Sequence, residues 1–250
     1  MYTSSRLRAS LPTFTAFFVA VLLAIGCRMP NAATETPPVM PIMPANDAPY
    51  TYLALGDSYT IGQSVADTVR WSVQLVKLLR GSGVAMQNAE IIARTGWTCN
   101  ELQTQGIVES GNHNTYDLVT LLIGVNNQFR GQPIEAFQTD FQNILSSALR
   151  FTKGIDQHHV VVLSIPDWGA TPYGSTYNRA TVSAEIDAFN AVERAECNRL
   201  GVRFVDITPI SRTALGDASM VASDGLHFSG KMYALWAAQA KAAATAALGK

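Results

Sequence analysis

From residue 50 onward, short apolar runs alternate with segments in which apolar residues recur at three- and four-residue intervals. The runs have the length of β-strands, and the longer spacing is typical of amphipathic helices. The predicted strands are Tyr50–Leu55, Met86–Ala93, Leu118–Ile123, Val160–Ile165 and Val202–Ile207, and the main predicted helices are Val69–Leu79, one opened by Pro133, Ser183–Leu200 and Lys231–Leu248.

Strands that alternate with helices predict a parallel sheet with right-handed crossovers, in a three-layer α/β domain. The third and fourth runs, Leu118–Ile123 and Val160–Ile165, are continuously apolar. Strands covered by helices on both faces have this pattern. In such a sheet the carboxyl ends of the strands lie at one edge, and ligands bind there.

The first 49 residues have a different pattern. Arg6 and Arg8 precede an uncharged apolar stretch, Leu11–Gly26, which is shorter than the ~18–20 residues of a membrane-spanning helix. The stretch ends in Leu-Ala-Ile-Gly-Cys27, which resembles a bacterial lipobox, where the cysteine is lipidated. An ordinary signal peptide cut nearby and an uncleaved anchor are the alternatives.

The sequence therefore divides into a signal peptide at 1–27, a proline-rich linker at 28–49 and one domain at 50–250. A proline-rich, nearly uncharged segment cannot build a core and tends to be extended. We expect an exported protein whose domain is lipid-anchored through Cys27, on the periplasmic or extracellular side of a bacterial membrane.

Composition narrows the function classes. The 250 residues are 48% hydrophobic, which is enough to bury one substantial core. A formal net charge of −1 gives no electrostatic reason to bind nucleic acid. The three cysteines include no Cys-x-x-Cys pair, and His113, His158 and His159 lack the spacing of metal ligands, so we expect no metal site.

Four short polar blocks stand at strand ends or in the last loop. They are Gly56-Asp57-Ser58, Thr95-Gly96, Gly124-Val125-Asn126-Asn127 and Asp224-Gly225-Leu226-His227. A serine alone is a poor nucleophile, so catalysis at Ser58 would need a base and an oxyanion stabiliser from elsewhere. Taken singly, each block is also compatible with an ordinary turn or helix cap.

The kind, order and spread of these blocks resemble the SGNH, or GDSL, hydrolase family of esterases and lipases, over about residues 50–247. The resemblance implies a flavodoxin-like sheet of order 2-1-3-4-5 and no metal or cofactor. It implies that Ser58 is the nucleophile, that His227 is the base and that Asp224 orients His227. The backbone N–H groups of Ser58 and Gly96 and the side-chain amide of Asn126 would form the oxyanion hole.

The sequence departs from the family in its third block, which usually reads Gly-x-Asn-Asp and here ends in Asn127. Asn126 is kept, so we expect catalysis to survive without the usual carboxylate. Asp57 is expected to tie the turn to local backbone N–H groups. No Gly-x-Ser-x-Gly surrounds Ser58, which argues against the α/β-hydrolase family proper.

Two cysteines and two tryptophans complete the sequence predictions, and the implied topology decides the case of the cysteines. Cys99 and Cys197 would lie at opposite edges and ends of the sheet, too far apart for a disulfide, so two buried free thiols are expected. Trp168, like Trp97, could line an acyl or glycan pocket or belong to the core.

The resulting prediction is a serine esterase acting on small-molecule or glycan acyl esters. Thioester hydrolysis, lysophospholipid hydrolysis and carbohydrate deacetylation are alternatives within the enzyme class. A lipoprotein that binds an acylated glycan or a lipid without turnover is the alternative from another class. The short predicted loops leave no obvious lid, which favours small or exposed acyl groups.

Overall fold

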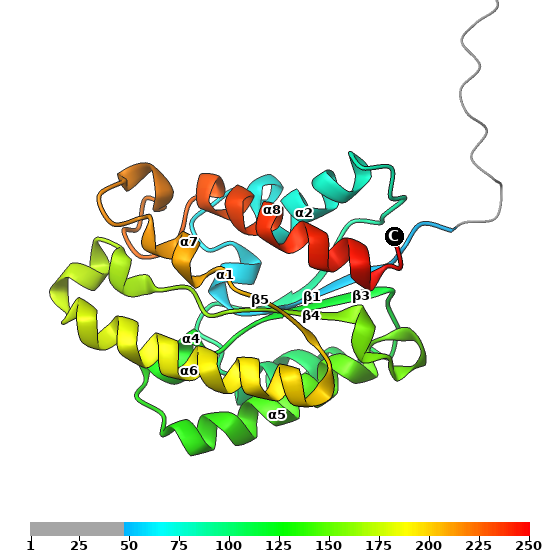
Figure 1. Cartoon of the computed structure of the whole chain (residues 1–250), viewed down its shortest axis with the longest axis horizontal. Helices are drawn as coiled ribbons and strands as arrows, with labels where there is room; N and C mark the ends of the chain where they lie inside the picture. The colour runs from blue at the N-terminus through cyan, green and yellow to red at the C-terminus, as the bar shows by residue number, and fades with distance from the viewer. Residues whose placement is uncertain (1–47) are drawn as a thin grey trace, which may run out of the picture. The chain divides into compact units, whose positions relative to one another are not determined.

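Five parallel strands form the centre of the domain in the computed structural model, which describes residues 48–250. Their order is β2-β1-β3-β4-β5, as the family resemblance implied. Helices α2 and α8 cover one face of the sheet, and α5 and α6 cover the other (Figure 1). The three-layer α/β prediction is thus confirmed. The strands are β1 (Tyr52–Gly56), β2 (Glu90–Ala93), β3 (Leu118–Leu122), β4 (Val160–Leu163) and β5 (Arg203–Val205).

The four long helices, α2, α5, α6 and α8, form where the apolar spacing predicted them. In α5, the buried apolar side chains share one face of the helix; they are Phe137, Phe141, Ile144, Leu145 and Ala148. Asn178 caps the start of α6 by accepting a hydrogen bond from the backbone N–H of Thr181. The helices are α1 (Ser58–Ile61), α2 (Trp71–Arg80), α3 (Cys99–Glu101) with the π-helical segment η2 (Leu102–Val108), α4 (Val125–Phe129), α5 (Ile134–Arg150), α6 (Arg179–Leu200), α7 (Thr208–Arg212) and α8 (Gly230–Ala247).

The core lies between the sheet and its two helical layers. Every residue of β1, β3 and β4 is buried. Burial removes their apolar surface from water, which stabilises the fold by about 25 cal/mol per Å². Large side chains fill the space between the layers, including Trp236 of α8 and Phe141 of α5.

The second strand is shorter than predicted. Pairing with β1 covers only Glu90–Ala93, whereas Met86 makes a single isolated bridge with Tyr50. The intervening Gln87 and Asn88 are exposed. Since β2 is an edge strand with a partner on one side only, polar residues there give up few backbone hydrogen bonds when they do not pair with β1.

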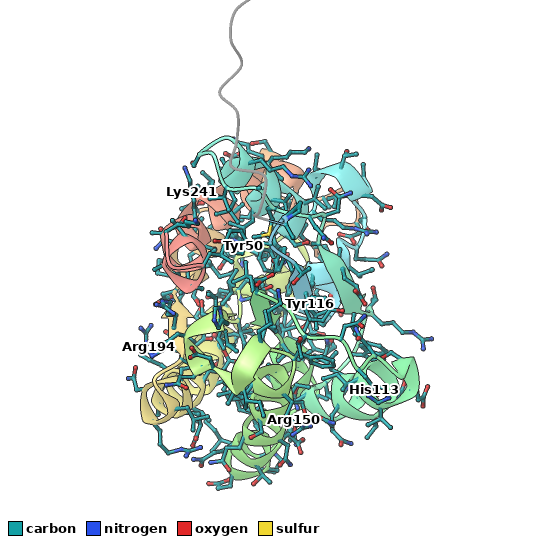
Figure 2. All side chains as sticks on the ribbon, turned by 90° about the vertical axis from the view of Figure 1, so that its right-hand side faces the viewer. Tyr50, His113, Tyr116, Arg150, Arg194 and Lys241 are labelled. Atoms are coloured by element: carbon teal, nitrogen blue, oxygen red, sulfur yellow. The ribbon has the colours of Figure 1, made fainter. Side chains whose placement is uncertain are left out.

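The strands begin at the end of the domain shown in Figure 2. Tyr50 lies just before β1, and Tyr116 just before β3, where it bridges to Thr152. Ser58 follows the carboxyl end of β1, at the opposite end of the sheet.

Several sequence predictions concern residues outside the described part of the chain. They are the signal peptide at 1–27, the lipidation of Cys27 and nearly all of the linker at 28–49. Within residues 48–250, no helix combines the length and the apolar character needed to cross a membrane.

Candidate active site

A small pocket opens at the carboxyl ends of β1 and β3, with a volume of about 80 Å³. Three of the predicted site residues, Ser58, Asn126 and His227, line it together. They come from α1, from α4 and from the loop before α8, which are far apart in the sequence. The remaining lining residues are Tyr59, Val125, Phe129, Trp168 and Leu226.

Ser58 owes its position to the turn that precedes it. Asp57 caps α1, because its Oδ1 accepts a hydrogen bond from the Tyr59 N–H at 3.0 Å. The structural role expected for Asp57 is thus confirmed. A Cβ at Gly56 would collide with Thr60 and with the carbonyl oxygen of Leu122, so only glycine lets β1 turn here. Ser58 is the first residue of α1, where backbone N–H groups have no partner inside the helix.

His227 is oriented by Asp224. Its Nδ1 lies 2.6 Å from Asp224 Oδ2. The other carboxylate oxygen, Oδ1, accepts from the N–H groups of Leu226 and His227, both at 2.9 Å. The ring of Tyr59 packs edge-on against the imidazole, with the centroids 5.8 Å apart. These contacts hold the imidazole ring from two sides.

Ser64 is a third partner of this carboxylate, and no motif pointed to it. Its hydroxyl donates to Asp224 Oδ2 at 2.6 Å. Partial burial alone would raise the pKa of Asp224, but the hydrogen bonds from Ser64, Leu226 and His227 bring it well below its ordinary value. Asp224 is therefore ionised at neutral pH.

Ser58 and His227 line the same pocket, but the described residues show no hydrogen bond between their side chains. Such nucleophile–base contacts are often long before a substrate binds.

The Gly96 loop lies against α4. Asn126 donates from Nδ2 to the carbonyl oxygen of Trp97 at 2.9 Å. Arg130 donates from Nη2 to the carbonyl oxygen of Gly96 at 2.6 Å and also pairs with Glu101. Gly96 itself has φ +89°, and among protein atoms a Cβ there would meet only Arg130, at 3.8 Å. Backbone conformation, rather than crowding by the protein, therefore favours glycine here.

The two tryptophans differ in position. Trp168 is almost fully buried and lines the pocket. Trp97 does not line it; the indole donates to Gln105 at 3.3 Å and packs over Gly106.

Two carboxyl groups lie buried close to the site. Asp57 Oδ2 and both oxygens of Glu193 are buried and have no hydrogen-bond partner among residues 48–250. Burial raises the pKa of Asp57 to about 7. Burial, and secondly the charge of Asp57, raises the pKa of Glu193 well above its ordinary value. Cys99 and Cys197 are also buried and are free thiols, as expected.

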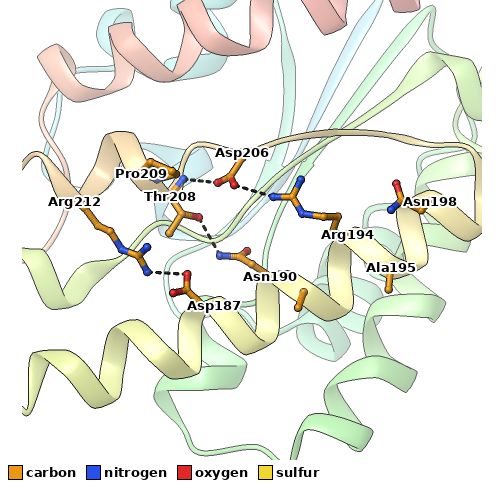
Figure 3. Close-up of a pocket in the computed structure, with 10 residues that line it drawn as sticks. Asp187, Asn190, Arg194, Ala195, Asn198, Asp206, Thr208, Pro209 and Arg212 are labelled. Carbon is orange, nitrogen blue, oxygen red and sulfur yellow. Dashed lines mark hydrogen bonds and ion pairs between the residues drawn. The ribbon is translucent and has the colours of Figure 1, made fainter.

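A larger cavity of about 320 Å³ lies between α6 and the segment after β5 (Figure 3). Its charged side chains are held in ion pairs. Arg194 pairs with Asp206 at 2.7 Å, and Arg212 pairs with Asp187 at 2.7 Å and with Asp167 at 2.8 Å. Every charged side chain that lines the cavity is thus engaged in an ion pair. Within residues 48–250, no group of three His, Cys, Asp or Glu side chains is placed to hold a metal ion.

Comparison with known proteins gives one family match. The model of the GDSL-like Lipase/Acylhydrolase family matches residues 54–235. No curated protein matches the chain.

Several solved structures are similar. The structure of TesA aligns with a TM-score of 0.59 and 18% identity, over 79% of this chain and 99% of that one. The esterase EstA from Pseudoalteromonas sp. aligns with a TM-score of 0.57 and 15% identity, over 80% and 100%. A variant of Axe2, an acetyl xylan esterase from Geobacillus stearothermophilus, aligns with a TM-score of 0.57 and 15% identity, over 78% and 94%. At such identities the likeness shows the fold.

Proposed function

The chain belongs to the GDSL-like lipase/acylhydrolase family and is a carboxylic ester hydrolase, and we propose that it acts through a triad of Ser58, His227 and Asp224. One observation carries this proposal. His227 is bonded to Asp224 at 2.6 Å and lines the same pocket as Ser58. A pure binding protein would need neither the charged partner of the imidazole nor a serine beside it.

The proposed mechanism follows from these positions. Ser58 Oγ attacks the ester carbonyl carbon while its proton passes to His227 Nε2. Asp224 holds the other ring nitrogen and stabilises the imidazolium. When the tetrahedral intermediate collapses, His227 gives the proton to the leaving alcohol. Water then attacks the acyl-serine by the same route and frees the carboxylic acid.

Three donors are proposed for the oxyanion. The N–H of Ser58 lies in the first turn of α1 and is free of helical bonding. The side-chain amide of Asn126 donates one N–H to the carbonyl oxygen of Trp97, and its second N–H can donate to the substrate oxygen. The N–H of Gly96 belongs to the loop that Asn126 and Arg130 hold.

The pocket size supports a short acyl group. Its volume of about 80 Å³ is well below the about 300–1,000 Å³ that is usual for a small-molecule site. An acetyl group fits such a space, whereas a long alkyl chain does not. The similarity to an acetyl xylan esterase agrees with a short acyl group. Thioesters and lysophospholipids are the alternative substrates.

Replacing Ser58 tests the function. Ser58→Ala should fold normally and lower kcat by at least ~10³, because loss of the nucleophile disables the whole triad. A serine-directed phosphonate should add one adduct to the wild type, at Ser58. The exposed Ser82 provides a matched control, and Ser82→Ala should keep full activity. A folded Ser58→Ala protein with wild-type turnover contradicts the proposal.

We also propose that the protein is exported and lipid-anchored through Cys27. The support is the order of Arg6, Arg8, an uncharged stretch and a lipobox-like end. Intact mass of the mature protein from a bacterial host tests it. A mature N-terminus other than Cys27, without an acyl mass, excludes the anchor.

A further inference from the structure

Exposed aromatic side chains gather on one side of the pocket. Phe129, Tyr173 and Tyr177 are 45%, 38% and 44% exposed. With the buried Trp168 they form one group of touching rings, with centroids 5.3 Å apart for Phe129–Trp168 and 4.9 Å apart for Trp168–Tyr177. We call these four residues the aromatic cluster. Exposed apolar side chains that gather at one place indicate a contact surface.

A second cavity, of about 240 Å³, adjoins the pocket. Phe129 and Trp168 line both cavities, so they stand at the boundary between them. Tyr177 lines the second cavity, and the polar side chains there include Asn178 and Glu185 at the start of α6. Small-molecule sites usually measure about 300–1,000 Å³, a size that the two cavities reach only together.

The boundary between the cavities is fixed by a chain of hydrogen bonds. The Trp168 indole donates to Gln128 Oε1 at 2.8 Å, and Gln128 Nε2 donates to Glu185 Oε2 at 2.7 Å. The hydroxyls of Tyr173 and Tyr177 bond to each other at 3.3 Å. A rigid aromatic surface loses little conformational entropy when a ligand binds.

The cluster is joined to the histidine loop. The backbone N–H of Tyr173 donates to the carbonyl oxygen of Gly225 at 2.9 Å, two residues before His227. In ester hydrolysis the imidazole must protonate the oxygen of the leaving alcohol. The aromatic cluster therefore lies next to the loop that carries the proposed base, His227.

We propose that the aromatic cluster binds the alcohol part of the substrate and that this alcohol is a sugar ring. This inference rests on the proposed esterase function and names its substrate class. The apolar face of a pyranose stacks on an exposed aromatic ring, and its hydroxyls find Asn178 and Glu185 at the far side. An alkyl chain would leave one side in water on so open a surface and meet polar groups that it cannot satisfy.

Kinetics with three esters test whether the aromatic cluster binds a sugar ring or an alkyl chain. They are a monoacetylated methyl glucopyranoside, ethyl acetate and ethyl octanoate, each assayed with the full chain. Loss of one stacked ring is worth roughly a three- to tenfold change in binding. Tyr177→Ala and Phe129→Ala should therefore raise KM for the sugar ester about three- to tenfold more than KM for ethyl acetate. Tyr177→Phe keeps the ring and should keep the low KM.

Leu215 provides the control. It is 60% exposed and lies outside both cavities, so Leu215→Ala should leave every KM unchanged. An increase in KM confined to ethyl octanoate would assign the cluster to an acyl chain and overturn the inference. Equal KM changes for all esters would overturn it as well. If the wild type hydrolyses none of the three esters, the proposed function itself fails; turnover of ethyl acetate with a sugar-ester KM unaffected by Tyr177→Ala contradicts only the inference.

Discussion

The side-chain oxygen of Asn127 accepts a hydrogen bond from the backbone N–H of Cys99 at 3.0 Å, which ties α4 to the first turn of α3. Its amide nitrogen donates to Gln132 Oε1 at 2.5 Å, and the side chain is buried. Asn127 stands where the family usually has an aspartate. The uncharged amide therefore holds this loop through one acceptor and one donor.

Removing the Asn127 side chain should weaken the fold. Asn127→Ala leaves the Cys99 N–H in a buried place without a partner, which costs about 1–3 kcal/mol of unfolding free energy. Asn127→Asp keeps the acceptor for Cys99 but sets a second oxygen against Gln132, so we expect a smaller loss. Urea unfolding of both variants measures this. An Asn127→Ala protein as stable as the wild type would show that the bond to Cys99 contributes nothing.

The sequence predicted the sheet and the position of the site because both depend on local patterns. Buried parallel strands are continuously apolar, and a motif next to such a strand must lie at the sheet edge. Short-range caps were also visible. Thr98 and Glu101 have the three-residue spacing of a capping box and form one at the start of α3, and Asp57 caps α1.

The rest depends on contacts between distant segments. Helices α1 and α4 have four and five residues, too few to show a periodic pattern. Ser64 and Asp224 are 160 positions apart. No spacing rule connects such residues, and the same holds for the contact of Arg130 with Gly96. Only the folded chain brings them together.

Loss of the Asn126 amide should affect the rate more than binding. A donor to the oxyanion bonds most strongly when charge has moved onto the oxygen, so its loss appears mainly in kcat. Removing one such donor costs roughly 10²–10³ in kcat. Kinetics of Asn126→Ala on one short-chain ester measure it, with folding checked by circular dichroism. If Asn126→Ala keeps its kcat while Asn127→Ala loses it, the oxyanion ligand is the neighbouring residue.

The buried Asp57 should make stability depend on pH. Its pKa is about 7 in the folded state against 3.8 as the ordinary value, because burial disfavours the charge. Between these two values the folded state holds a proton that the unfolded state has lost. The contribution of Asp57 to the free energy of unfolding is therefore greatest below pH ~4, falls as the pH rises to ~7 and stays low at higher pH. The total decrease is up to about 4 kcal/mol, at 1.36 kcal/mol for each unit of pKa difference.

Asp57→Asn isolates this contribution. The amide oxygen keeps the bond from Tyr59 N–H and cannot ionise. Urea unfolding measures the free energy of unfolding at pH 5 and at pH 8. From pH 5 to pH 8, this free energy should fall more in the wild type than in Asp57→Asn. Parallel pH profiles would mean that Asp57 does not titrate in this range.

The hydroxyl of Ser64 should contribute to turnover through Asp224. It donates to the same carboxylate oxygen that His227 Nδ1 contacts, both at 2.6 Å. Ser64→Ala should raise the pKa of Asp224 and loosen its orientation. A net hydrogen-bond contribution of about 0.5–1.5 kcal/mol corresponds to a roughly two- to tenfold loss in kcat.

Backbone strain gives this prediction a matched control. Ser64 has φ +64°, a left-handed conformation that glycine adopts at no steric cost. Ser64→Gly should therefore be more stable than Ser64→Ala by about 0.5–1 kcal/mol, although both variants lack the hydroxyl. Because the hydroxyl is what Asp224 loses, the two variants should show the same reduced kcat. If Ser64→Gly recovers wild-type kcat while Ser64→Ala does not, the effect comes from backbone strain, and Ser64 does not position Asp224.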